Sequence, residues 1–297
     1  MPEVTTRDGV RLAYEEAGHG RALLLVHGWS AHAGFFAPQI ETLSQRFRVI
    51  APDLRGHRRS PAPSSGATVE RLALDIQDLL DALDVRDAVA AGWSLGAMVL
   101  WRALLDGAGE RISGMVVIDM TPRVPAADDW QLGMLGGYDP DETPALTLSM
   151  RQDWPAYSRR IVRRLFAADL PVPDALAAWA EAEITRNDPA WMAGLWQSLA
   201  GQDFRAALSG IPIPTLVAHG GRSQLYGPGT AAFLETTMPD ARRVAFDRSG
   251  HAPHLEEPEL FNRTIEEFAA GLPTGPTNGI ARRTGLTGTL NRRETRP

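Results

Sequence analysis

The sequence predicts an α/β fold built on a mostly parallel sheet, and two observations carry that prediction. Short apolar runs recur along the chain, and they are continuous rather than alternating, which is typical of strands buried on both faces. Helical patterns lie between most of these runs, and strand–helix alternation indicates a parallel sheet. The expected strands are residues 22–26, 48–51, 88–91, 114–118, 214–218 and 243–246.

A hairpin is expected ahead of these strands. Residues 4–7 and 10–14 alternate apolar and polar side chains on either side of Asp8-Gly9, a strong turn dipeptide. The chain therefore begins with two antiparallel strands.

Three of the segments between strands have clear helical patterns. Residues 69–83 place their apolar side chains on one stripe. Residues 95–105 are nearly all apolar, so this helix is expected to be buried. Residues 258–270 follow an acidic pair, which suits the positive end of a helix dipole. On the first helix, three acidic side chains fall away from the apolar stripe: Asp75, Asp78 and Asp81.

One long interval breaks the alternation of strands and helices. Residues 122–204 contain no convincing strand but do contain helical segments rich in tryptophan and arginine. We interpret this interval as a helical cap inserted between two strands. The expected organisation is a core in two parts (1–121 and 206–272), a cap (122–205) and a tail (273–297). The tail carries five arginines against Glu294 and no apolar periodicity, which predicts disorder.

The composition excludes several kinds of protein. The 297 residues contain no cysteine, which excludes disulfides, thiolate nucleophiles and cysteine-ligated metals. A net charge of −6 argues against a nucleic-acid binder, which needs a basic surface. No metal-ligand spacing, phosphate loop or dinucleotide fingerprint is present, so neither metal nor cofactor is expected.

The expected location is the cytoplasm. No apolar run approaches the ~20 residues of a membrane helix, and the first residues lack a signal-peptide pattern. A monomer and a homodimer both stay open.

The strongest chemical signal is the segment Gly92-Trp93-Ser94-Leu95-Gly96. It follows an expected strand and opens an expected helix, which is the context that a Gly-x-Ser-x-Gly nucleophile elbow requires. The turn is too tight for side chains at either glycine, and it exposes the serine oxygen at a helix N-terminus. Ser94 is therefore the candidate nucleophile.

A serine nucleophile needs a base, and His251 is the best placed histidine. It follows Gly250 in the loop between the last expected strand and the last helix. That loop lies on the same sheet edge as Ser94. His254, three residues further on, is the closest rival.

Four motifs together resemble the α/β-hydrolase superfamily over about residues 3–272. They are His27-Gly28-Trp29, Asp53-Leu54-Arg55-Gly56-His57, the elbow around Ser94, and Gly250-His251. The resemblance implies an oxyanion hole made by the backbone N–H groups of Trp29 and Leu95. It also implies that His27 and Asp53 shape loops and take no part in catalysis.

The sequence departs from the superfamily pattern at two positions. Arg58 stands where a glycine is usual, so either this loop is repositioned or Arg58 faces the cleft entrance. Ser223 stands where the triad acid is common, and a serine cannot hold a carboxylate's charge beside an imidazolium. The best candidate for the acid is Asp119, at the end of a strand expected to lie beside that of Ser94. The alternative is that Asp119 caps the following turn, and Asp247 is a poorer rival.

Aromatic residues are expected to line the substrate pocket, with Trp93, Trp130, Trp154 and Tyr226 as candidates. Cap carboxylates at Glu181 and Glu183 are interpreted as solvated, with amine binding as the alternative. A basic cluster is interpreted as a solvated helix face, with attraction of an anionic acyl carrier or a carboxylate substrate as the alternative. This cluster comprises Arg159, Arg160, Arg163 and Arg164.

The sequence thus predicts a serine hydrolase that cleaves carboxylic esters through an acyl-enzyme, with Ser94, His251 and Asp119 as the triad. Within the superfamily it resembles capped carboxylesterases, including the pimeloyl carrier-protein methyl ester esterases. The expected partner is a small ester or acyl substrate, free or carrier-bound. A thioesterase, lactonase, carbon–carbon bond hydrolase or perhydrolase on the same triad stays open. So does a non-catalytic relative, for which Ser223 is the only support.

Overall fold

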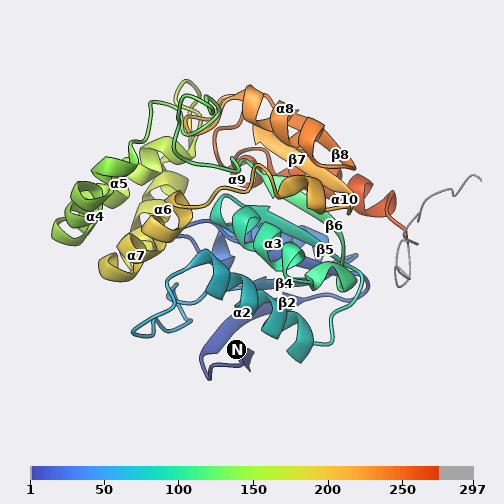
Figure 1. The fold of residues 1–297 in the computed structure, drawn as a ribbon. Coiled ribbons are helices and arrows are strands. Elements are labelled where there is room, and N and C mark those ends of the chain that lie inside the picture. The colour runs from blue at the N-terminus through green and yellow to red at the C-terminus, as the bar shows by residue number, and fades with distance from the viewer. Residues whose placement is uncertain (1, 274–297) are drawn as a thin grey trace, which may run out of the picture.

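An eight-stranded sheet forms the centre of the computed structural model, which describes residues 2–273 (Figure 1). The strand order is β1-β2-β4-β3-β5-β6-β7-β8. The pairs β1–β2 and β2–β4 are antiparallel, and every other pair is parallel. The predicted α/β class is therefore confirmed. The strands are β1 (Glu3–Thr5), β2 (Arg11–Ala17), β3 (Ala22–Val26), β4 (Arg48–Pro52), β5 (Ala88–Trp93), β6 (Ile112–Ile118), β7 (Thr215–Gly220) and β8 (Ala241–Phe246).

Burial of the strands follows their place in the sheet. The central strands β3, β5 and β6 are buried along their whole length, as continuous apolar runs predict. The edge strand β8 is mostly exposed or half-buried, so the expectation of burial on both faces is wrong there. Its exposed positions carry arginines that make surface contacts: Arg242 lies over the ring of Phe268, and Arg243 pairs with Glu235.

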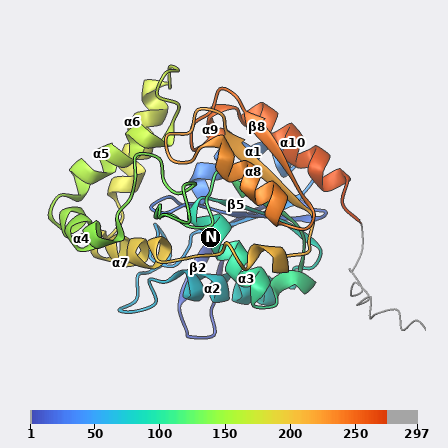
Figure 2. The same cartoon turned by 45° about the horizontal axis from the view of Figure 1, so that its top comes forward.

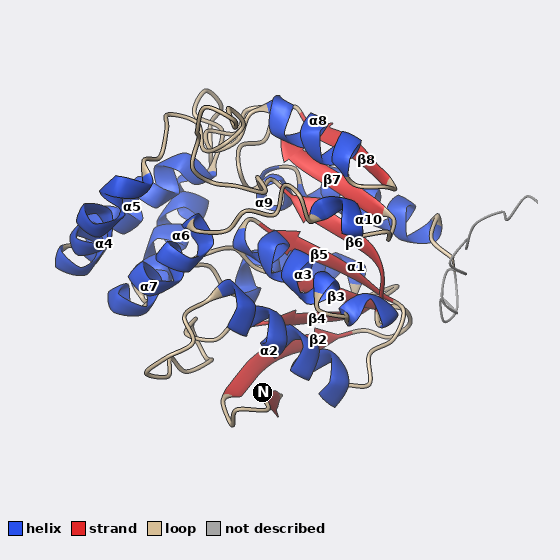
Figure 3. Cartoon of the chain, in the orientation of Figure 1, coloured by secondary structure: helices blue, strands red, loops and turns tan. Residues whose placement is uncertain are grey.

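Helices cover both faces of the sheet (Figure 3). α2 packs against α3 on one face, and α1 packs against α10 on the other, while α8 contacts β7 and β8. The α-helices of the core are α1 (Ala37–Leu43), α2 (Val69–Ala82), α3 (Leu95–Leu105), α8 (Pro228–Thr237), α9 (Pro253–Glu256) and α10 (Pro258–Ala270). Short 3₁₀ turns are η1 (Ala33–Phe36), η2 (Ala108–Glu110), η3 (Pro140–Glu142) and η4 (Leu208–Gly210).

The acidic side chains of α2 do not share one environment. Asp75 is fully buried and pairs with Arg55 at 2.7 Å and with Arg71 at 2.8 Å. The prediction that Asp75 falls away from the buried side of this helix is therefore wrong. The loop after β4 supplies the cation Arg55, and helical periodicity in α2 alone contains no information about that loop.

Four helices lie between β6 and β7 in the chain and are called the cap from this point (Figure 2). They are α4 (Thr143–Gln152), α5 (Trp154–Leu165), α6 (Asp174–Thr185) and α7 (Pro189–Ala200). Across 122–204 the only strand-like pairing is an isolated bridge between Ala127 and Trp130. Residues 274–297 of the predicted tail lie outside the described residues. Within the described residues, none of the helices is both long and apolar enough to cross a membrane.

Candidate active site

Ser94 stands at the tight turn between β5 and α3. Its backbone has a φ of 52°, in the left-handed region that non-glycine residues rarely adopt. A Cβ on Gly92 would come within 2.5 Å of the backbone of Gly96, and a Cβ on Gly96 would lie 2.1 Å from the carbonyl oxygen of Val26. Both glycines are therefore required for the close approach of helix and strand that exposes Ser94.

His251 and Asp119 are in direct contact. The Nδ1 atom of His251 lies 2.7 Å from Oδ2 of Asp119, and the two side chains are 3% and 1% exposed. Because a carboxylate only accepts hydrogen bonds, Nδ1 of His251 is the donor in this pair, which leaves Nε2 as the acceptor. Asp119 directly follows β6 and has a φ of 43°, so it also sits in a strained turn.

Ser223 supports Asp119 through the same carboxylate oxygen that His251 contacts. Its hydroxyl donates to Oδ2 of Asp119 at 2.6 Å and accepts the backbone N–H groups of Leu225 and Tyr226 at 3.2 Å each. The backbone N–H of Gly220 donates to Oδ1 of the same carboxylate at 3.2 Å. The loop after β7 thus contributes hydrogen bonds to Asp119 and no acid of its own.

The loop that carries His251 is held from three sides. The indole N–H of Trp93 donates to the carbonyl of His251 at 2.8 Å, and the N–H of His251 donates to the carbonyl of Leu165 at the end of α5. Glu256 accepts the backbone N–H groups of Gly250 at 2.7 Å and Ala167 at 2.8 Å. Burial raises the pKa of Glu256 to about 7.

Sequence reasoning missed this role of Glu256. Glu256 belongs to the acidic pair before α10, which the sequence analysis assigns to the helix dipole. No sequence pattern indicates that its carboxylate bonds to the loop of His251.

Two backbone amides lie beside Ser94. Trp29 is in a turn closed by the N–H of Ala31 and the carbonyl of Gly28 at 3.2 Å. Leu95 is the first residue of α3, where N–H groups have no partner inside the helix. Within residues 2–273, neither amide donates a hydrogen bond.

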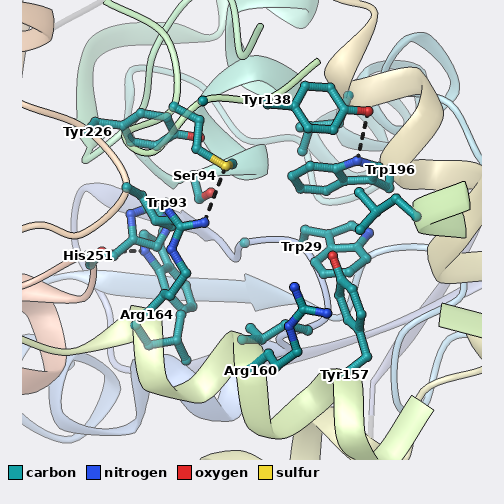
Figure 4. A pocket seen from close by; sticks show the side chains of 18 of the residues that line it. Trp29, Trp93, Ser94, Tyr138, Tyr157, Arg160, Arg164, Trp196, Tyr226 and His251 are labelled. Carbon is teal, nitrogen blue, oxygen red and sulfur yellow. Dashed lines mark hydrogen bonds between the residues drawn. The ribbon is translucent and has the colours of Figure 1, made fainter. Parts of the chain in front are cut away.

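A cavity of about 280 Å³ opens over Ser94 and His251, between the core and the cap (Figure 4). Trp93 and Tyr226 line it, but Trp130 and Trp154, which the sequence placed in the pocket, do not. The ring of Trp130 is buried and packs 4.8 Å from that of Phe233 on α8. Trp154 stacks on Tyr157 and contacts Trp29, one layer behind the wall. The missed lining residues come mainly from the cap and include Trp29, Tyr138, Tyr157 and Trp196.

Two arginines of α5, Arg160 and Arg164, also line the cavity and point into it in Figure 4. Their spacing of four residues puts both on one helix face. Arg164 donates to the carbonyls of Leu135 and Gln224 at 2.8 Å each, and burial lowers its pKa. The interpretation of this cluster as a solvated face is therefore wrong for the half-buried Arg164, whereas Arg160 is exposed as expected although it also lines the cavity. Arg159 does face outward, with Glu181 at 3.8 Å.

Comparison with known proteins places the chain in a family. A sequence model described as alpha/beta hydrolase fold matches residues 21–258. The chain belongs to the α/β-hydrolase fold family. Among relatives, this hydrolase is 33% identical over 252 residues to the pimeloyl-[acyl-carrier protein] methyl ester esterase of Nitrosomonas europaea, covering 83% of this chain and 95% of that protein. It is 27% identical over 287 residues to the non-heme chloroperoxidase CPO-A1 of Kitasatospora aureofaciens, covering 90% and 99%.

A solved structure of similar shape is the esterase EaEST from Exiguobacterium antarcticum. The TM-score is 0.84 at 25% identity, and the match covers 90% of this hydrolase and 98% of that chain. The similar structure and the similar sequences therefore both include esterases of the α/β-hydrolase fold.

Arg58, which stands at a usual glycine, has a φ of 44°, so the loop keeps a backbone shape that favours glycine. Its guanidinium donates to Nδ1 of His32 at 3.2 Å. Nε2 of His32 lies 3.0 Å from Glu183 on α6. Glu183 is therefore largely buried in this hydrolase, and its interpretation as solvated is wrong because the loop after β3 supplies a partner.

His27 and His254 have surroundings that differ from that of His251. Nε2 of His27 accepts the N–H of Leu54 at 2.9 Å, and burial lowers the pKa of His27 to about 4. His254 is buried beside Phe36 and Trp93, and within the described residues neither ring nitrogen has a hydrogen-bond partner. Within residues 2–273, no cluster of three His, Cys, Asp or Glu side chains fits a metal ion.

Proposed function

We propose that this ester hydrolase of the α/β-hydrolase fold family cleaves carboxylic esters through a Ser94–His251–Asp119 triad. Ser94 Oγ attacks the ester carbonyl carbon while Nε2 of His251 takes the serine proton. The alcohol leaves with that proton from His251. Water then attacks the acyl-enzyme with His251 again as base, and the carboxylic acid departs.

The other roles follow from the surroundings of the triad. Asp119 holds the imidazole with Nδ1 toward itself and stabilises the imidazolium that forms. The amides of Trp29 and Leu95 supply donors for the oxyanion of the tetrahedral intermediate, because both flank Ser94 and lack other partners among the described residues.

The observation that carries this proposal is the 2.7 Å contact of His251 with Asp119, at the floor of the cavity that Ser94 lines. That contact supports a catalytic protein over a non-catalytic relative, because Ser223 supports an acid here and does not replace one.

The test is Ser94→Ala, with the exposed Ser209→Ala as a matched control. With p-nitrophenyl butyrate, we expect Ser94→Ala to lose on the order of 10⁴-fold to 10⁶-fold in kcat and to escape labelling by a fluorophosphonate probe. Retained esterase activity in a purified Ser94→Ala preparation would refute the proposal. A chain-length series of p-nitrophenyl esters then measures the depth of the acyl pocket.

A carrier-bound acyl ester is the second candidate substrate, and Arg160 and Arg164 favour it. Both line the cavity, and within residues 2–273 neither has a carboxylate at ion-pair distance. An anionic carrier or carboxylate near the cavity would supply that partner. The esterase of Nitrosomonas europaea, by its name, acts on a carrier-bound methyl ester, which agrees with this candidate.

Arg160→Gln tests the second candidate, with Arg159→Gln on the outer side of α5 as control. We expect kcat/KM for a carrier-bound pimeloyl methyl ester to fall about tenfold in Arg160→Gln, because a charge-assisted contact is lost. The rate with uncharged dimethyl pimelate should stay close to that of the parent. Equal losses on both substrates would show that Arg160 only shapes the cavity.

A further inference from the structure

The turn that carries the Trp29 amide is strained. The hydrogen bond from Ala31 N–H to Gly28 closes it, and Ser30 at its third position has a φ of 63°. A turn with positive φ at this position is of type II, for which glycine is the preferred residue. Ser30 itself offers no compensation, because its hydroxyl is buried without a hydrogen-bond partner among the described residues.

The corner between cap helices α6 and α7 contacts this turn. Asn187 Nδ2 donates to the carbonyl of Ser30 at 2.7 Å and to that of Ile184 at 2.9 Å. On the other side of the turn, the indole N–H of Trp29 donates to the carbonyl of Met192 on α7 at 3.0 Å. Cap residues therefore hold Trp29 and Ser30, the two central residues of the turn that presents the Trp29 amide.

The side chain of Trp29 is also surrounded by the cap. Its ring centroid lies 5.3 Å from that of Trp196 (Figure 4) and 5.8 Å from that of Trp154, and both contacts are edge-to-face. Trp29 thus has its side chain among cap residues and its backbone amide beside Ser94. A conformation with positive φ persists only where the surroundings enforce it, and here the surroundings are cap residues.

We propose that Asn187 is a positioning residue that keeps the Ser30 turn in its strained form and so aims the Trp29 amide at the oxyanion. This inference rests on the proposed function. In it the cap completes the oxyanion hole as well as enclosing the substrate. Asn187 does not touch the substrate: it is 9% exposed and is not among the cavity-lining residues.

The experiment compares Asn187→Ala and Asn187→Asp with the parent, using Gln197→Ala, an exposed position on α7, as control. With p-nitrophenyl butyrate, we expect both Asn187 variants to lose about tenfold to 100-fold in kcat with KM unchanged, because a donor misplaced by about 1 Å costs about that much. Binding of a trifluoromethyl ketone, whose adduct carries an oxyanion, should weaken by the same factor.

Rescue separates positioning from a general structural role. Ser30→Gly removes the cost of the positive φ, so Ser30→Gly in the Asn187→Ala background should recover kcat roughly fivefold. Unchanged kcat in both Asn187 variants would overturn the inference. So would a loss that tracks a lower melting temperature and is not rescued. Ser94→Ala is run in the same assay: if it is inactive while Asn187 variants are normal, only this inference fails, and if it is active the proposed function fails.

Discussion

Asp119 makes more hydrogen bonds than the orientation of one imidazole requires. Oδ2 accepts from both His251 and Ser223, and Oδ1 accepts from the Gly220 amide. Three donors around one buried carboxylate satisfy its oxygens and fix the plane in which it meets the ring. The loop after β7, which lacks an acid, thus helps to support the acid that directly follows β6.

This arrangement predicts that Asp119 is the acid on which the triad depends. Asp119→Asn should lower kcat on the order of 10⁴-fold, by analogy with the serine proteases, because an amide favours the wrong tautomer of His251. Asp247→Asn is the matched control, since Asp247 is exposed four residues before the histidine. The measurement is kcat on p-nitrophenyl butyrate. An intact kcat in Asp119→Asn, or a comparable loss in Asp247→Asn, would contradict the assignment.

At the residue scale, site residues that belong to local motifs can be predicted from the sequence. Ser94 and His251 lie in short segments that require glycine at neighbouring positions, and those glycines mark where the two residues are. Glu256 and Asn187 bind backbone atoms of distant segments, at Ala167 and Ser30. A bond to a backbone atom places no demand on the type of the distant residue, so nothing in the sequence pairs these positions.

Helix α2 shows the same limit at the scale of one element. Its boundaries and apolar stripe follow from periodicity, and Thr68 caps it by accepting the N–H of Arg71. The environment of each aspartate depends on what the neighbouring loops supply. Asp75 meets the buried Arg55, whereas Asp81 meets Arg111 at the surface, with 57% of the Asp81 side chain exposed.

The two aspartates should therefore differ in their contribution to stability. Asp75→Ala removes the buried carboxylate that pairs with the buried guanidinium of Arg55. We expect this substitution to lower the free energy of unfolding by about 3 kcal/mol. Asp81→Ala removes a solvated ion pair and should cost less than about 1 kcal/mol. Urea unfolding followed by circular dichroism compares them. Equal effects of the two substitutions would mean that the Asp8 carboxylate, which also lies 2.8 Å from Arg55, is sufficient to neutralise that guanidinium.

The inserted helices are the least predictable elements. The sequence indicates that 122–204 is helical, but it does not indicate which helix faces Ser94. Their aromatic rings make Trp130 and Trp154 candidates in the sequence, but the cavity wall instead contains Trp29, Tyr157 and Trp196. The eight-residue loop from Phe166 to Pro173 and the break before α7 set the angles between cap helices, and those angles decide which rings face inward.

Across the whole molecule, four buried histidines are neutral for one common reason. Burial lowers the pKa of His27 and His32 to about 4 and that of His57 and His254 to about 3. In the unfolded chain the same side chains bind protons near pH 6.5. Between about pH 4 and pH 6.5 the unfolded state therefore binds more protons, and the free energy of unfolding falls as the pH is lowered through that window.

Glu256 contributes with the opposite sign. Burial raises the pKa of its carboxyl to about 7, so between about pH 4.5 and pH 7 the folded state holds a proton that the unfolded state has lost. Its contribution to the free energy of unfolding decreases as the pH rises through this window. A comparison of two proteins that differ at one histidine cancels the Glu256 contribution and isolates that histidine.

His254 is the histidine on which this can be measured, because within the described residues its ring nitrogens make no hydrogen bonds and its neighbours are Phe36, Trp93 and Phe261. Phenylalanine can occupy the same aromatic site without taking up a proton. Between pH 4.5 and pH 5.5, His254→Phe should reduce the slope of unfolding free energy against pH by about 1.4 kcal/mol per pH unit. The exposed His19→Gln should leave that slope as it is in the parent. Urea unfolding at several pH values measures the slope, and a parent-like slope in His254→Phe would mean that this ring is already protonated in the folded protein.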